Sequence, residues 1–387
     1  MKKIGIITFH FAKNIGAVLQ CVGLYKQLQK MGFEPYVINY RPKYHEAKYA
    51  AWKPPFYLAK QYSIMVKHMG IKDKHLLFEI LKRFASVLWG NRLFFANKKK
   101  NHCFEQFLLQ YLKQSTLYRN INQLKNNPPK GDIYICGSDQ IWNKSLTNGI
   151  YDQAYFLQFG DSVIKRIAYA VSMGETDILA DTQDYINNTK MMDNISFRET
   201  CDCAKANKIT QKHHQTVRDP SLFLNKDEWE LFEKEVDVKT PYIFVYTVLK
   251  SEVVKRIVTE ACDNHKVIDV SNHKYIHGNK NYTYNETCGP GEFLSYIKNA
   301  QFVITNSFHG TVFSIIYHKS FITIANKKRN ERMEELLKFV GLEGRFLNDI
   351  NFVEIEKLEE IDYQLVDEKL KLGRMHDINF LYQSFEL

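Results

Sequence analysis

The first forty residues of the chain alternate between a strand pattern, a helix pattern and a second strand pattern. Residues 4–8 and 36–40 are short runs rich in β-branched and aromatic side chains, which predict strands. Residues 17–30 have apolar side chains at helical spacing, and Gly32 suits a left-handed helix stop. A strand–helix–strand unit predicts a right-handed parallel sheet. The N-terminal part of the chain is therefore predicted to adopt an α/β fold.

A second alternation follows in the C-terminal half, with predicted strands at 242–248, 267–270, 302–305 and 321–324 and predicted helices at 252–262, 292–299 and 333–339. A length of 387 residues suits two domains of ordinary size. We expect two Rossmann-like domains at 1–225 and 226–361, with a cleft between them and a helical tail at 362–387. One substrate could then bind to each domain.

A strand-to-helix junction in the second half combines polar and small residues: Asn306, Ser307, His309 and Gly310. Free amides at the start of a helix attract anions, and open α/β sheets bind ligands at such strand ends. His309 is a side chain that can move protons near neutral pH. The alternative is a helix capped by Ser307 or Asn306, with a histidine that fills space. This stretch alone does not decide between the two.

The first half contains comparable loops. Asn14 and Gly16 precede the first predicted helix without a G-x-G-x-x-G fingerprint, so they form either a ligand loop or a tight turn. A second polar loop, residues 137–143, follows the strand predicted at 132–136. Arg198 is either a fork for phosphate or carboxylate or the ion-pair partner of Glu199.

The formal net charge is +10, and residues 41–100 contain 14 Lys and Arg against 3 Asp and Glu. Two segments of this basic block, 56–69 and 75–95, are apolar, aromatic and basic, like helices that lie on an anionic membrane. The interpretation we favour is a helical insertion whose apolar face packs on the domain. The block carries no motif that reads nucleic acid, so we expect no nucleic-acid partner.

Three further features concern location and metals. No apolar run approaches the length of a membrane span, and the apolar start of the chain is too short for a signal peptide. The seven Cys are an odd, scattered set without a disulfide framework. Cys201 and Cys203 have no second pair of Cys or His at zinc spacing. We expect a cytoplasmic protein with no metal.

Six pieces of the sequence, taken in order, resemble the polysaccharide pyruvyl transferase family: 14–20, 137–143, 168–172, 196–199, 219–220, and 306–310 with 313–314. Each piece is weak by itself, and their common order is specific. The resemblance covers nearly all of the chain outside the basic block. It implies a GT-B-like fold, in which a C-terminal helix often crosses back to the first domain.

The resemblance also implies an activity. The pyruvyl group of phosphoenolpyruvate would be transferred to two hydroxyls of a sugar, in a surface polysaccharide or its lipid-linked precursor, to form a cyclic ketal. Phosphoenolpyruvate is then a substrate, and no cofactor is expected. By resemblance, Arg198 would hold the anionic charge of the donor and His309 would transfer a proton. Phe308 stands where some relatives carry Arg, which removes one candidate anion contact.

The expected binding residues fall into two groups. Donor binding is assigned to Asn306, Ser307 and Gly310 together with Arg198, in the second domain and at its border. Acceptor binding is assigned to the first domain, at Asn14, Gly16, Gln20, Ser138, Asp139 and Trp142.

Two other classes of function remain open. A nucleotide-sugar glycosyltransferase of the same architecture would need a carboxylate for the ribose in the second domain, where Glu286 and Glu292 are candidates. A non-catalytic carbohydrate-binding relative is the third possibility. The basic block leaves open a peripheral contact with the inner face of an anionic membrane.

Overall fold

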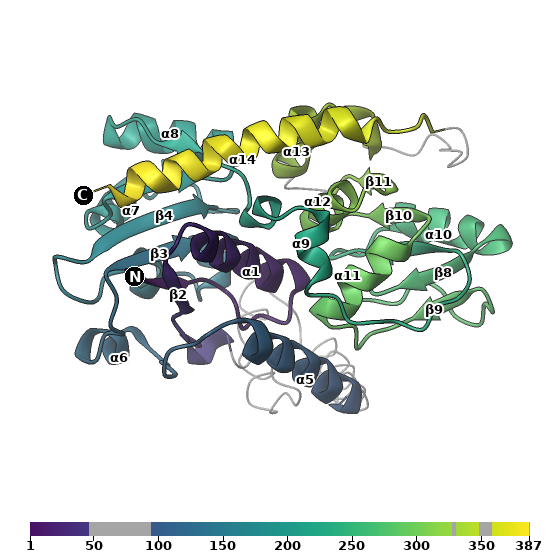
Figure 1. Cartoon of the computed structure of the whole chain (residues 1–387), viewed down its shortest axis with the longest axis horizontal. Coiled ribbons are helices and arrows are strands. Elements are labelled where there is room, and N and C mark those ends of the chain that lie inside the picture. The colour runs from purple at the N-terminus through teal and green to yellow at the C-terminus, as the bar shows by residue number, and fades with distance from the viewer. Residues whose placement is uncertain (46–93, 327–329, 348–357, 387) are drawn as a thin grey trace, which may run out of the picture.

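The computed structural model describes residues 1–45, 94–326, 330–347 and 358–386 (Figure 1). Most of the basic block predicted as an insertion, including residues 56–69, lies outside the described residues. The two halves of the described chain form two sheets of six strands each.

Both sheets are parallel, as the strand–helix–strand pattern predicts, and the α/β fold class is confirmed. The order in the first sheet is β2-β1-β3-β4-β5-β6, and in the second it is β12-β11-β10-β7-β8-β9. The strands of the first sheet are β1 (Lys3–Ile7), β2 (Glu34–Val37), β3 (Ile133–Gly137), β4 (Lys165–Val171), β5 (Asn194–Phe197) and β6 (Gln215–Thr216). Those of the second are β7 (Tyr242–Tyr246), β8 (Lys266–Asp269), β9 (Tyr282–Tyr284), β10 (Phe302–Thr305), β11 (Ser320–Ile324) and β12 (Phe346–Leu347).

Helices connect the strands. In the first half they are α1 (Ile15–Lys30), α5 (Phe94–Tyr111), α6 (Ile121–Asn126), α7 (Thr182–Thr189) and α8 (Thr200–Thr210). In the second half they are α9 (Lys226–Glu230), α10 (Glu252–Asn264), α11 (Pro290–Asn299), α12 (Phe308–Ile316), α13 (Glu331–Val340) and α14 (Tyr363–Phe385). The short 3-10 helix η3 (Pro220–Phe223) lies between the halves. Among the described helices, none combines the length and the apolar character needed to cross a membrane.

Helix α1 lies where the two halves meet. It contacts η3, α11 and α12, and nearly all of its residues from Ile15 to Leu28 are buried. One cluster of buried apolar side chains includes residues of β1, α1, β7, α11 and α12. The two sheets are therefore joined by a continuous apolar core, because α1 packs on elements of both.

Helix α14 runs from the second domain back across the first, as the resemblance implies (Figure 1). Arg218 Nη1 donates a hydrogen bond to Asp377 Oδ1 at 2.9 Å, and the rings of Phe33 and Phe385 lie 4.8 Å apart. The C-terminal helix thus ties the two domains together on one side.

Some boundaries differ from the sequence prediction. Helix α12 begins at Phe308, so His309 is in the first helical turn and not in a loop. The short strands β5, β6, β9 and β12 were not predicted. Three of them, β6, β9 and β12, have three residues or fewer, which is too short to show a strand pattern.

Candidate active site

Three side chains from separate segments meet at the junction of the domains. Arg198 follows β5, Asp219 precedes η3, and His309 belongs to α12. Asp219 Oδ2 accepts a hydrogen bond from Arg198 Nη1 at 3.0 Å and lies 3.6 Å from His309 Nε2. All three residues are at most 7% exposed. We call these residues the Arg–Asp–His cluster.

Asp219 is the centre of this cluster. Its Oδ1 accepts hydrogen bonds from the amide and the hydroxyl of Ser221, at 3.0 and 2.6 Å, and Ser138 donates to Oδ2 at 3.2 Å. Burial by itself would raise the pKa of Asp219, but His309, Arg198 and Ser221 together hold that pKa well below its usual range. Asp219 is therefore ionised, and it can both anchor the guanidinium and stabilise a positive imidazole.

Arg198 has a further binding capacity. Its Nε donates to Glu199 Oε1 at 3.1 Å. Burial opposes the charge of Arg198, but Glu199, Asp219 and Asp139 outweigh burial and raise its pKa above the ordinary value. Arg198 Nη2 is buried and has no hydrogen-bond partner among the described residues. Both sequence interpretations of Arg198 are thus compatible: it pairs with acids and keeps one nitrogen for a ligand.

The first domain reaches His309 through Gly16. A Cβ atom placed on Gly16 would lie 1.9 Å from Nδ1 of His309, so any larger residue would displace the ring. The structure therefore places Gly16, predicted on the acceptor side, against the imidazole of the other domain.

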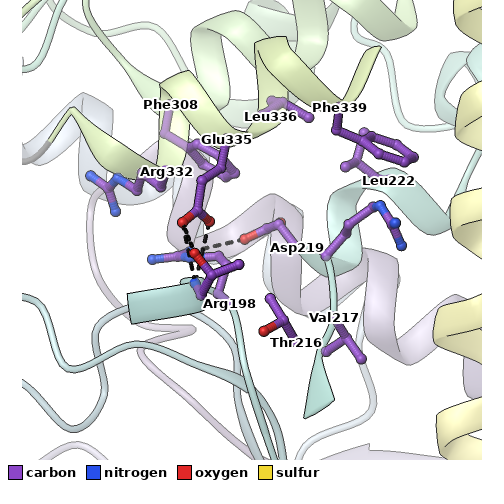
Figure 2. Close-up of a pocket in the computed structure, with 12 residues that line it drawn as sticks. Arg198, Thr216, Val217, Asp219, Leu222, Phe308, Arg332, Glu335, Leu336 and Phe339 are labelled. Atoms are coloured by element: carbon purple, nitrogen blue, oxygen red, sulfur yellow. Dashed lines mark hydrogen bonds and ion pairs between the residues drawn. The ribbon is translucent and has the colours of Figure 1, made fainter. Parts of the chain in front are cut away.

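A cavity of about 280 Å³ lies beside the cluster (Figure 2). Arg198, Asp219 and Phe308 line it, and the Phe308 ring centre is 5.2 Å from the guanidinium carbon of Arg198. The other lining residues come from both domains: Thr200, Thr216, Val217, Arg218, Leu222, Arg332, Glu335, Leu336 and Phe339. The cavity combines basic groups with an apolar wall and can hold a small organic anion.

The other predicted donor residues hold the β10–α12 junction in shape. Asn306 accepts a hydrogen bond from the Val248 amide at 2.9 Å and donates one to the Leu249 carbonyl at 2.7 Å. Ser307 caps α12 by accepting from the Gly310 amide at 3.4 Å, as the alternative interpretation states. Their roles in donor binding stay predictions.

Several predicted acceptor residues are occupied by internal contacts. Asn14 caps α1 through the Ala17 amide at 3.1 Å, and Gln20 Oε1 accepts from the Ser138 amide at 3.1 Å. Ser138 nevertheless contacts Asp219 directly, whereas Gln20 contacts the backbone of Ser138 and does not reach Asp219 by this bond.

Asp139 and Trp142 make different contacts, although the charge of Asp139 also acts on Arg198. Asp139 is half-buried with a φ of 68°, and its Oδ1 accepts from the Gln140 amide at 2.8 Å. Trp142 is 1% exposed and stacks on Phe156 at 4.6 Å. The indole is thus part of the first domain's core and presents no face to a ligand.

Sequence reasoning missed Asp219, Arg332 and Glu335 as site residues. Asp219 gave a signal, because the Asp219–Pro220 pair is one of the six pieces that carry the resemblance. Arg332 and Glu335 gave none, because charged residues on an amphipathic helix such as α13 are ordinarily solvated.

Two parallel sheets joined across a buried Arg–Asp–His cluster define a two-domain α/β protein with a charged cluster at the domain junction. The model of one family, described as polysaccharide pyruvyl transferase, matches residues 14–328. The chain belongs to the polysaccharide pyruvyl transferase family. This finding confirms the resemblance and supports a transferase that acts with a sugar or polysaccharide.

Comparison with solved structures finds GT-B glycosyltransferases and epimerases. The UDP-GlcNAc 2-epimerase of Methanocaldococcus jannaschii is 11% identical with a TM-score of 0.45, covering 95% of this chain and 92% of that one. The glycosyltransferase SnogD of Streptomyces nogalater is 10% identical with a TM-score of 0.44, covering 99% of each chain. Because both TM-scores are below 0.5, these similarities carry no argument beyond the two parallel sheets of the structure itself. No curated protein matches the chain.

Proposed function

We propose that this protein transfers the pyruvyl group of phosphoenolpyruvate to two hydroxyls of a sugar, in a surface polysaccharide or its lipid-linked precursor. The products are a cyclic ketal and phosphate. Family membership supports pyruvyl transfer in general. One observation supports an anionic donor here: Nη2 of the buried Arg198, beside the His309–Asp219 pair, has no hydrogen-bond partner among the described residues.

The residues fit the steps of this reaction. The first sugar hydroxyl adds to the central carbon of the enol while the methylene carbon gains a proton. The second hydroxyl then displaces the phosphate, and the C–O bond to phosphate breaks. His309 can carry a proton in either step, and ionised Asp219 would stabilise the imidazolium. Arg198 would hold the carboxylate or phosphate of the donor.

We further propose that the protein acts in the cytoplasm and that residues 41–100 bring it to the anionic inner face of a membrane. The charge of this block supports the proposal. Binding to anionic vesicles should weaken with salt, because exposed charge is screened over about 8 Å at physiological ionic strength. Equal binding to neutral and anionic vesicles would contradict it.

The glycosyltransferase alternative has less support. Glu292, one of its two candidate ribose ligands, accepts from the Gly289 amide at 2.9 Å and forms the capping box of α11. That carboxylate is therefore occupied by a structural role.

The deciding experiment measures phosphate release from phosphoenolpyruvate across a panel of oligosaccharide and lipid-linked acceptors, with mass spectrometry of the sugar product. We expect release that depends on one acceptor class, and a product with a pyruvyl ketal. Sugar transfer from a nucleotide donor in place of this reaction would establish the alternative.

A further inference from the structure

Glu335 makes an unusual contact between the domains. It belongs to α13 of the second domain, yet its two carboxylate oxygens lie 3.3 Å from the amide of Thr200, the first residue of α8 in the first domain. Thr200 Oγ1 also donates to Glu335 Oε1. A carboxylate from one domain thus occupies the start of a helix in the other.

The start of α8 offers a favourable place for a negative charge. Glu199, the residue before the helix, makes no side-chain capping bond, so the positive end of the helix dipole is satisfied by Glu335. Helix α8 has 11 residues, which is long enough for this dipole effect. A phosphate or carboxylate ligand would suit the same amide.

Independent groups around the contact point to a ligand. Arg198, directly before Glu199, is 95% buried and keeps Nη2 without a hydrogen-bond partner in the described part of the chain. Its guanidinium lies below Glu335 in the cavity of about 280 Å³ (Figure 2). Arg332, one helical turn before Glu335, has its guanidinium carbon 5.5 Å from the Phe308 ring and lines the same cavity. Two guanidinium groups and a helix start therefore line the same cavity as Glu335.

We propose that the start of α8, Arg198 and Arg332 form an anion site, whose helix start is held by Glu335 in this structure. A phosphate or carboxylate of the substrate binds there by displacing Glu335. The identification of that ligand as the donor rests on the proposed function, whereas the anion site itself does not. Because Glu335 joins α13 to α8, the displacement also removes one contact between the domains.

The test titrates wild type, Glu335→Gln and Glu334→Gln with inorganic phosphate and, separately, with pyruvate, which presents a carboxylate without phosphate. Glutamine keeps an acceptor for Thr200 but removes the competing charge. Removal of one like charge from the site should tighten anion binding about five- to tenfold. Glu334→Gln, at the exposed neighbour on the same helix, is the matched control and should leave the anion affinity unchanged. The anion whose affinity rises more in Glu335→Gln is the one whose charged group the site binds.

Thr200→Pro supplies a second, independent variant. Proline is tolerated at the first helical position, and the extended backbone of Glu199 (φ −101°, ψ 135°) allows a proline to follow. This variant removes both donors of Thr200 while keeping α8, so we expect anion binding to be lost with little change in melting temperature.

The outcomes are separable. Equal anion affinity of wild type and Glu335→Gln, or no binding by either, would overturn the anion site. Tighter binding by Glu335→Gln in a protein that releases no phosphate from phosphoenolpyruvate would keep the anion site and overturn the proposed donor.

Discussion

Two strand-to-helix junctions meet at the Arg–Asp–His cluster, and they use their polar groups in different ways. At the β10–α12 junction, Asn306 and Ser307 are engaged in hydrogen bonds that shape the junction itself. At the β5–α8 junction, Arg198 Nη2 and Glu199 Oε2 are buried without hydrogen-bond partners among the described residues. The first amide of α8 is bound by a carboxylate of the other domain. We infer that the β10–α12 junction positions His309, whereas the β5–α8 junction is arranged to bind a ligand.

The largest expected effect is on His309, the reactive group of the positioning junction. His309→Gln keeps a hydrogen-bonding side chain but removes titration, so turnover should fall about 10²- to 10⁴-fold. Donor binding and the melting temperature should be retained. Steady-state kinetics over a pH range and thermal unfolding would measure these properties.

His318→Gln is the control for that variant, because His318 follows the same helix and pairs with Asp367 at 3.0 Å, away from the cluster. Turnover of His309→Gln within a few-fold of wild type would show that His309 is not the proton carrier. Loss of folding together with activity would show that its role is packing.

A smaller effect is expected for Arg198, the binding group of the other junction. A lysine cannot bond Glu199 and Asp219 and still offer a planar third contact. Loss of one charged hydrogen bond to the donor should raise its KM about tenfold or more. Acceptor KM should hold, and Arg256→Lys, in an exposed ion pair with Glu260, is the control. An unchanged donor KM would reassign Arg198 to a structural ion pair.

The smallest effect on activity is expected for Asn306. Asn306→Ala leaves the Val248 amide and the Leu249 carbonyl without their partner, which should lower the free energy of unfolding by about 1–3 kcal/mol. Donor KM should stay near the wild-type value. Urea unfolding and kinetics would measure both, with Asn187→Ala on the exposed side of α7 as the control. A rise in donor KM as large as that of Arg198→Lys would show that the β10–α12 junction also binds the donor.

The architecture could be predicted from sequence where periodicity is strong. Strands such as β1 and β10 are continuous buried runs, and α1 has a clear apolar spacing and a glycine stop. The two-residue strands β6 and β12 could not be predicted, because their pairing depends on neighbours that sequence does not place.

The site was predictable only in part. Arg198 and His309 were predicted as site residues from their side-chain chemistry, and the structure brings both to Asp219. Their roles stay predictions. Asp219 acts through contacts with residues 21 and 90 positions away, which only the tertiary structure brings together. Trp142 was assigned to acceptor binding with the loop 137–143. An aromatic side chain suits both a sugar and a core, and the burial of Trp142 places it in the core.

The close approach of Gly16 to His309 has a consequence for how the two domains can move. The imidazole belongs to the second domain and the surface that confines it belongs to the first. Any separation of the domains therefore leaves the ring free to rotate, and their return fixes its direction again. A side chain at position 16 would prevent this close contact, because a single added methyl group would meet the imidazole before the two domains reach their present distance. On the proposed role of His309, the arrangement of the two domains in this structure is the one that holds the ring in a fixed direction for proton transfer.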